Sequence, residues 1–202
     1  GSMLSVKPEN GDGDFQFSRG SAATRVNAQG LVEEITDTDL PRIDYTDGCG
    51  NWLLEPQSTN LYLNSETLAT QSNATSASTY TVSFYGTGTI TFSGTHTGTL
   101  VGTGANDRVS VTFTATSGTL TSTISGTCTK GQLENLSYAT SYIPTDGAIA
   151  TRLADVATNS GNSTLINSTE GVLYGEGYFE QTDSTNGLFA ISDGTFSNLL
   201  MV

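Results

Sequence analysis

The sequence predicts an all-β protein, an antiparallel β-sandwich of the jelly-roll type, and three observations support this prediction. Polar positions are filled mainly by Thr, Ser, Asn and Gly, and charged residues make up only 13% of the 202 residues, which is typical of exposed sheet faces. Apolar segments with period-two alternation, and with Thr on the outward positions, recur about every ten residues. No stretch keeps helical spacing of apolar side chains for more than about one turn.

The first part of the chain is predicted to be irregular and then to form short strands. Residues 1–14 are rich in turn-forming Pro, Asn and Gly, so they predict a flexible entry. Gly1-Ser2-Met3 is typical of a tag remnant ahead of a native Met. Residues 15–64 alternate short apolar clusters with turns such as Asn27-Ala28-Gln29-Gly30, which predicts short strands or hairpins.

The central part is predicted to hold the main strands. Residues 68–78 begin with helix formers but become rich in Ser, Thr and Asn, so a loop or one helical turn is expected. The alternation from Tyr80 and the following Gly-Thr-Gly turn predict a hairpin over residues 80–92. A second hairpin is predicted over residues 109–128, and residues 132–134 begin a closing strand.

A domain boundary is predicted near residue 158, where a polar, Gly-containing linker follows. Residues 15–158 then form the β-sandwich domain, and residues 159–202 hold the first strands of a second, incomplete β-sandwich. A segment of about 40 residues cannot bury such a sheet alone. The chain is therefore either cut short there or completed by another chain, and the apolar end Leu199–Val202 favours truncation.

The charge of the chain limits its partners. Seven Lys and Arg residues against 20 Asp and Glu residues give a net charge of −13. This charge repels phosphate backbones and anionic lipids, so nucleic-acid binding is disfavoured. No apolar run approaches the ~20 residues that span a bilayer, so no membrane insertion is expected. Neutral sugars and Ca²⁺ remain permitted partners.

Two segments have no explanation in periodicity or composition, SRGSAATRVNAQGLVEEI (18–35) and QLENLSYATSYIPTDGAIATRLADV (132–156). Two further phrases accompany them, PRIDY (41–45) and WLLEPQSTNLYLNSE (52–66). Together they resemble a family of modular phage structural proteins of the tail-fibre or appendage type, over roughly residues 14–202. The resemblance implies a carbohydrate-binding jelly roll with galactose-binding-like topology, followed by a laminin-G or concanavalin-like module. It also implies a virion protein made in the host cytoplasm, which leaves by lysis and needs no signal peptide.

The expected function is non-catalytic attachment to host-surface glycans as part of a virion appendage. Host polysaccharide, other virion subunits and further copies of the chain, assembled as a trimer, are the expected partners. The alternative is a purely structural spacer or oligomerisation module, because a fold does not determine a function.

Candidate glycan-binding residues follow from the chemistry of sugar recognition. Flat aromatic rings cover the apolar face of a pyranose, while amides, carboxylates and Arg orient its hydroxyl groups. Trp52 follows a Gly-rich turn and is either exposed there or the start of a buried run. Tyr85 alternates off the core positions and is expected to be at least half accessible. The other candidates are polar residues expected in turns or at strand edges: His96, Asn106, Asp107 and Arg108.

No catalytic residue, metal site or cofactor is predicted. Glu176 and Glu180 resemble the acidic strand of jelly-roll glycoside hydrolases, but four residues along a strand separate carboxylates by ~13 Å, beyond the roughly 5–9.5 Å of a glycosidase pair. A structural Ca²⁺ near Asp12-Gly13-Asp14 or Asp37-Thr38-Asp39 is conceivable but supported by no motif.

The two cysteines, Cys49 and Cys128, are too few for a zinc site and lack the Cys-x-x-Cys spacing. Cys128 is expected to face inward on one strand with Leu120 and Ile124. Cys49 lies in a Gly-rich turn. Sequence alone leaves open whether the two thiols are free or form a disulfide.

Overall fold

A computed structural model describes residues 2–3, 15–158, 190–192 and 199–201. Its described residues contain β-strands and no helix, which confirms the all-β prediction and leaves no helical candidate for a membrane span within those ranges. The chain forms two compact units, Gly1–Ser160 and Gly161–Val202. In the second unit, β17 (Ala190–Ser192) pairs antiparallel with β18 (Leu199–Met201). The other strands predicted there, and the predicted flexible entry up to residue 14 apart from Ser2–Met3, lie outside the described residues.

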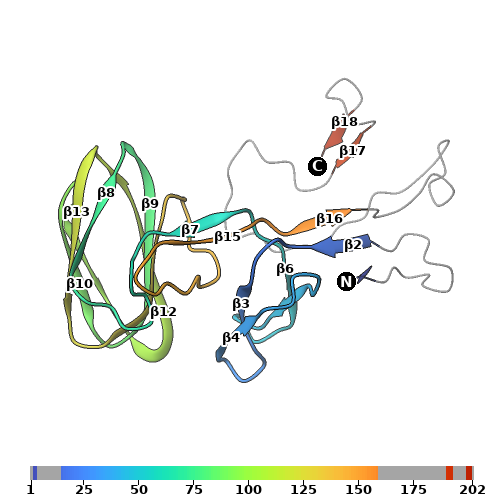
Figure 1. The fold of residues 1–202 in the computed structure, drawn as a ribbon, viewed down its shortest axis with the longest axis horizontal. Coiled ribbons are helices and arrows are strands. Elements are labelled where there is room, and N and C mark those ends of the chain that lie inside the picture. Colours follow the sequence, from blue (N-terminus) through green and yellow to red (C-terminus); the bar gives the residue numbers. More distant parts are fainter. Residues whose placement is uncertain (1, 4–14, 159–189, 193–198, 202) are drawn as a thin grey trace, which may run out of the picture. The chain divides into compact units, whose positions relative to one another are not determined.

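Two antiparallel sheets form the central part of the first unit (Figure 1). The four-stranded sheet has the order β11-β10-β13-β8, and its strands are β8 (Gln71–Thr75), β10 (Thr89–Gly94), β11 (Gly98–Val101) and β13 (Gly118–Ser125). The three-stranded sheet has the order β12-β9-β14, with β9 (Ser78–Gly86), β12 (Gly104–Ala115) and β14 (Cys128–Glu134). The sandwich strands thus come from residues 71–134, a narrower range than residues 15–158.

One buried cluster joins the two sheets, as the alternation predicts. Val82 and Phe84 of β9 pack with Ile90 of β10 and Leu120 of β13, and all four are 0% exposed. Burying side chains of this size stabilises the fold by about 1.5–3 kcal/mol each relative to leaving them exposed. The arrangement is therefore sandwich-like, with its apolar side chains between the sheets.

The predicted hairpins over residues 80–92 and 109–128 are wrong. β9 and β10 lie in different sheets, and so do β12 and β13, because each connection crosses from one sheet to the other. Within the sandwich, consecutive strands β10 and β11 do form a hairpin, in which Thr89 pairs with Val101. β13 ends at Ser125, so Cys128 starts the next strand in the opposite sheet, although it is buried as expected.

The segment predicted as a loop or helical turn at residues 68–78 is also corrected. It contains β8, an edge strand that pairs with β13. Its side chains alternate between half-buried or buried and exposed positions. Small polar residues suit an edge strand with one face in water, which helix propensity did not reveal.

Close backbone approach explains the Gly-Thr-Gly repeats at one end of the sandwich. A Cβ atom on Gly86 would lie 2.2 Å from Thr127 O, and one on Gly102 would lie 2.2 Å from Gly86 O. Gly88 N donates to Thr127 O at 2.8 Å. Because glycine has no side chain, three backbone segments can pass close to one another at this end of the sandwich.

The outward face of the three-stranded sheet is covered by residues 136–145, which we call the cover loop. Thr81 Oγ1 donates to Leu136 O at 2.9 Å, and Ile143 N donates to Gln132 Oε1 at 2.6 Å. The loop backbone thereby satisfies polar side chains that would otherwise face water. These outward side chains are buried: Thr81, Ser83, Tyr85, Gln132 and Glu134.

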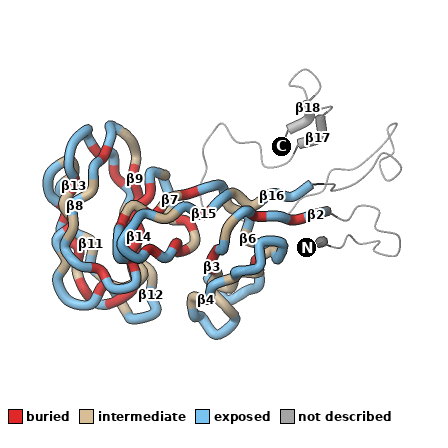
Figure 2. Tube along the Cα trace, viewed as in Figure 1, coloured by how far each residue is buried: buried red, intermediate tan, exposed pale blue. Residues whose placement is uncertain are grey.

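Two antiparallel strand pairs connect the sandwich to the rest of the unit, and we call them the inner and outer stems. In the inner stem, β7 (Ser58–Asn60) pairs with β15 (Ala150–Arg152). In the outer stem, β2 (Phe15–Ser18) pairs with β16 (Val156–Thr158), and β1 (Ser2–Met3) adds to β2. Figure 2 shows buried residues along both stems, outside the sandwich.

Two hairpins, as predicted for residues 15–64, branch from the chain between β2 and β7. The first joins β3 (Ala23–Val26) to β4 (Val32–Ile35), and the second joins β5 (Arg42–Asp44) to β6 (Asn51–Leu53). In the first turn, Asn27 Oδ1 accepts hydrogen bonds from Gln29 N and Leu31 N, both at 3.0 Å. This side-chain turn is the usual role of Asn at such positions.

Candidate functional site

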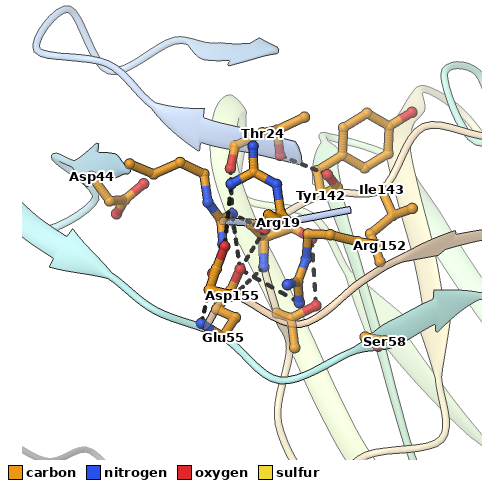
Figure 3. Close-up of polar contacts among 12 residues, drawn as sticks. Arg19, Thr24, Asp44, Glu55, Ser58, Tyr142, Ile143, Arg152 and Asp155 are labelled. Atoms are coloured by element: carbon orange, nitrogen blue, oxygen red, sulfur yellow. Dashed lines mark hydrogen bonds and ion pairs between the residues drawn. The ribbon is translucent and has the colours of Figure 1, made fainter. Parts of the chain in front are cut away.

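Five charged residues meet where the two stems adjoin, and we call them the arginine–carboxylate cluster: Arg19, Arg42, Glu55, Arg152 and Asp155 (Figure 3). The arginines are 2%, 0% and 1% exposed in that order. Arg19 follows β2, Asp155 precedes β16, Glu55 precedes β7 and Arg152 ends β15. The cluster therefore lies between the outer and inner stems.

Asp155 bridges two of the arginines. Its Oδ1 lies 3.2 Å from Arg19 Nη1, and its Oδ2 lies 2.5 Å from Arg42 Nη2. Asp155 Oδ2 also accepts a hydrogen bond from Glu55 N at 2.8 Å. Because the side chains of Asp155, Arg19 and Arg42 are 0% exposed, each charge depends on its partners and not on water.

Glu55 continues the cluster toward the cover loop. Its Oε2 lies 3.0 Å from Arg42 Nη1 and 3.5 Å from Arg152 Nη2. Ser141 N and Ser141 Oγ donate to the same carboxylate at 2.7 and 2.6 Å. Burial is the main influence that lowers the pKa of Arg152, with Arg42 acting in the same direction and Glu55 opposing it.

A buried carboxylate on the sandwich side completes this polar layer. Glu134 is 0% exposed and accepts hydrogen bonds from Ser58 Oγ at 2.6 Å, from Thr140 N at 3.0 Å and from Thr140 Oγ1. It thus ties β14 to the inner stem and to the cover loop. The carboxylates of Asp155 and Glu134 are fully buried and the Glu55 side chain is 10% exposed, and all three accept hydrogen bonds that tie the connecting strands to the sandwich.

The four phrases that carry the family resemblance supply the residues of the arginine–carboxylate cluster. Arg19 comes from the first phrase, Arg42 from PRIDY, Glu55 from the third, and Arg152 and Asp155 from the fourth. Sequence reasoning singled out the phrases but no member of the cluster. The partners Arg19 and Asp155 are separated by 136 positions, and no local pattern indicates such a pairing.

The predicted glycan-binding residues are not brought together by the structure. Tyr85 and Arg108 do meet, with the Arg108 guanidinium 5.9 Å from the centre of the Tyr85 ring. Tyr85 is only 8% exposed, so the expectation that it is at least half accessible is wrong. Burial raises the pKa of the Tyr85 hydroxyl, against the opposing effect of Arg108. Arg108 itself donates to Thr140 O at 2.6 Å and to Ser83 Oγ at 2.8 Å.

His96 lies elsewhere, stacked on Phe113 with ring centroids 4.0 Å apart and planes inclined by 7°. Phe113 belongs to the core side of β12, whereas Arg108 lies five residues away on the other side, about 17 Å along the strand. Asn106 and Asp107 are exposed within β12, where the pairing register shifts, and not in a turn as predicted.

Trp52 is the most accessible of the predicted aromatic contacts. It pairs with Ile43 in the second hairpin and is 51% exposed, so it does not begin a buried run. The neighbouring Asn51 and Asp47 are exposed, and Asn51 Nδ2 donates to Asp47 Oδ2 at 2.8 Å. An exposed indole offers the flat apolar surface that a sugar contact requires.

A pocket of about 200 Å³ lies between β3 and β15, next to Arg152. Its lining is mostly small or apolar: Ser21, Ala22, Ala23, Glu34, Tyr142, Ile143, Pro144, Ala150, Thr151 and Arg152. Arg152 Nε has no hydrogen-bond partner, yet it is sealed from solvent. A ligand in the pocket would not reach this atom unless the wall moved.

The remaining candidates show no assembled site. Both cysteines are free, Cys49 exposed and Cys128 buried, and burial raises the pKa of the Cys128 thiol. Within the described ranges, no group of three or more His, Cys, Asp or Glu side chains is placed to hold a metal ion. Asp37 Oδ1 accepts a hydrogen bond from Asp39 N at 2.9 Å, as in a turn. Asp12, Asp14, Glu176 and Glu180 lie outside the described residues.

Comparison with protein-family models, curated proteins and solved structures found no match.

The buried Tyr142 hydroxyl predicts that the protein loses stability at alkaline pH. Tyr142 donates to Glu66 Oε2 at 3.3 Å and shares a 2.7 Å hydrogen bond with Ser65 Oγ. Burial, with the negative charge of Glu66, raises the pKa of Tyr142 to about 12. The folded chain keeps this proton where the unfolded chain has released it, so the stabilisation is complete below about pH 10 and is lost as the pH rises toward 12.

We expect urea unfolding to show the free energy of unfolding falling by on the order of 2 kcal/mol from Tyr142 between about pH 10 and 12. Tyr142→Phe should lose less stability over this interval than the natural chain does. Equal losses in the two proteins would contradict the assignment.

Proposed function

We propose that the chain is a non-catalytic module of a phage tail-fibre-like appendage that binds glycans on the host surface. The resemblance of the four phrases, the acidic charge and the all-β fold support this proposal. In the finer assignment, the sandwich is a jelly roll related to carbohydrate-binding and galactose-binding-like modules. Strand order supports this, since β8, β9 and β10, and again β11 to β14, alternate between the sheets. Residues 159–202 are then the start of a laminin-G or concanavalin-like module.

The observation that carries the proposal is the way the chain enters and leaves the first unit. In the outer stem, Gln16 pairs with Thr158, so the entering and leaving strands are neighbours. An in-line spacer requires its two connections at opposite ends. In this unit β2 begins and β16 ends at the same end of the outer stem, so the opposite end of the unit carries neither connection, which is a suitable arrangement for displaying a binding surface.

A structural role toward other virion subunits is the second candidate. Large apolar side chains are exposed outside the sandwich strands, among them Leu31, Leu40, Leu54, Ile149 and Val156. Such side chains are typical of surfaces that contact other subunits when they lie together. Assembly as a homotrimer within the virion belongs to this proposal.

Glycan binding is tested with an array of bacterial surface polysaccharides, probed with the natural chain and with Trp52→Ala. We expect specific binding by the natural chain and about a tenfold loss in the variant, because the indole supplies the stacking surface. Tyr138→Ala is the matched control, since Tyr138 is also an exposed aromatic residue, at 41%.

Equal binding by all three proteins would remove Trp52 from the site. No binding to any polysaccharide, together with a stable oligomer in light scattering, would favour the structural role instead.

A further inference from the structure

We propose that the arginine–carboxylate cluster is a mechanical latch, which resists separation of the entering and leaving strands and keeps tension away from the sandwich. This proposal is independent of glycan binding. It follows from three features: the direction in which the outer stem is loaded, the place of the cluster in that direction, and the sharing of partners within the cluster.

The outer stem is loaded in its weakest direction. Its registered pairs run from Gln16 with Thr158 to Ser18 with Val156. Once β1 has separated from β2, tension on the two connections pulls β2 and β16 apart from the same end. Under this geometry the backbone hydrogen bonds are loaded one after another, as in a zipper, and not all at once.

After these backbone pairs have opened, the next contact that must break is the ion pair of Arg19 with Asp155. They are the next residues in register after Ser18 and Val156, and their side chains form an ion pair at 3.2 Å with 0% exposure. Arg19 is also fixed to the first hairpin, because its Nε donates to Ser21 O at 2.7 Å and its Nη2 to Ile35 O at 3.4 Å. Opening the stem further requires that these buried groups separate.

Shared partners make the cluster resist as a unit. Asp155 contacts both Arg19 and Arg42, and Glu55 contacts both Arg42 and Arg152. Loss of one ion pair leaves the other charges buried and underpaired, and water cannot replace the contact until the junction opens. Arg152 pairs with Ser58 in the inner stem. Tension therefore reaches the inner stem and the sandwich only after the cluster has separated.

The test is single-molecule stretching of the full chain, held by peptide tags at its two termini. Separation of the latch would release residues 19–57 and 153–155, which add about 140–150 Å of extended chain. This event comes before the unfolding of residues 58–152, which the inner stem encloses. Residues 58–152 would then extend by about 310–340 Å in a separate event. Residues 1–18 and 156–202 belong to neither event, and their contribution to the total extension is the same in all variants.

Asp155→Asn is expected to lower the force of the 140–150 Å event about twofold or more and to leave the later event unchanged. Glu33→Gln is the matched control, since Glu33 pairs with Arg25 at the surface of the first hairpin, and it should change neither force. If Asp155→Asn does not fold, Arg19→Lys keeps the charge but removes the forked contacts, and it should weaken the first event alone.

Extension of the sandwich before the latch, or equal weakening of both events by the latch variants, would overturn the proposal. An unchanged first event in Asp155→Asn and Arg19→Lys would do the same.

Discussion

Replacing Asp155 by Asn is expected to lower the free energy of unfolding by about 3–5 kcal/mol, the usual cost of removing one partner from a buried ion pair. The carboxylate serves Arg19 at 3.2 Å and Arg42 at 2.5 Å, so its neutralisation leaves two buried guanidinium groups with too little negative charge. For a chain of this length the melting temperature should fall by roughly 6–20 °C, measured by circular dichroism or calorimetry.

Glu33→Gln is the control for this prediction. The Arg25–Glu33 ion pair has a contact of 2.5 Å, but its side chains are 26% and 35% exposed. An exposed pair contributes about 0–1 kcal/mol and is weakened by salt. The effect of Asp155→Asn should persist at high salt, whereas that of Glu33→Gln should shrink. Similar small effects from both substitutions would show that the cluster contributes little to stability.

The sequence predicted which side chains face the sandwich core, because alternation reports the face of a strand directly. Val82, Phe84 and Leu120 are fully buried where the period-two pattern places them. The same pattern carries no information about the sheet to which the next strand belongs. A Gly-Thr-Gly link fits both a hairpin and a crossing between sheets, and here it forms a crossing.

The predicted site failed at Tyr85 for a different reason. Alternation correctly placed Tyr85 away from the sandwich core, but a polar sheet face can be covered by water or by backbone groups. In this protein the cover loop supplies the backbone, as in the contact of Thr81 Oγ1 with Leu136 O. A segment that covers a sheet in this way has no periodicity, so composition and spacing did not reveal it.

The arginine–carboxylate cluster therefore accounts for the charged residues in the phrases that carry the family resemblance. A buried arginine requires partners at fixed positions, and those partners come from strands that are distant in sequence but adjacent in the nested stems. Arg42, for example, reaches Ser141 Oγ at 2.7 Å across 99 positions. The buried members of these phrases thus join the sandwich to its connecting strands, whereas the exposed Trp52 of the third phrase remains available to a partner.

Replacing Gly86 by Ala is expected to destabilise the sandwich by roughly 2–5 kcal/mol, through backbone strain and a steric contact that add together. Gly86 has φ of +130°, which side-chain-bearing residues rarely adopt, and its Cβ would lie 2.2 Å from Thr127 O. The contact is with backbone at a crossing of β9 and β14, so a side chain cannot simply rotate away. Urea unfolding of the variant measures the combined cost.

Gly48→Ala separates the two contributions. Gly48 also has a positive φ, +83°, but a Cβ atom added there would have no atom within 4 Å beyond its chain neighbours. Its substitution should cost only the backbone strain, about 1–2 kcal/mol. The difference between the two variants then combines the close packing at the glycine-rich end of the sandwich with the greater backbone strain of φ +130° compared with +83°. If both alanine variants lose the same stability, the crossing is looser than the 2.2 Å approach requires.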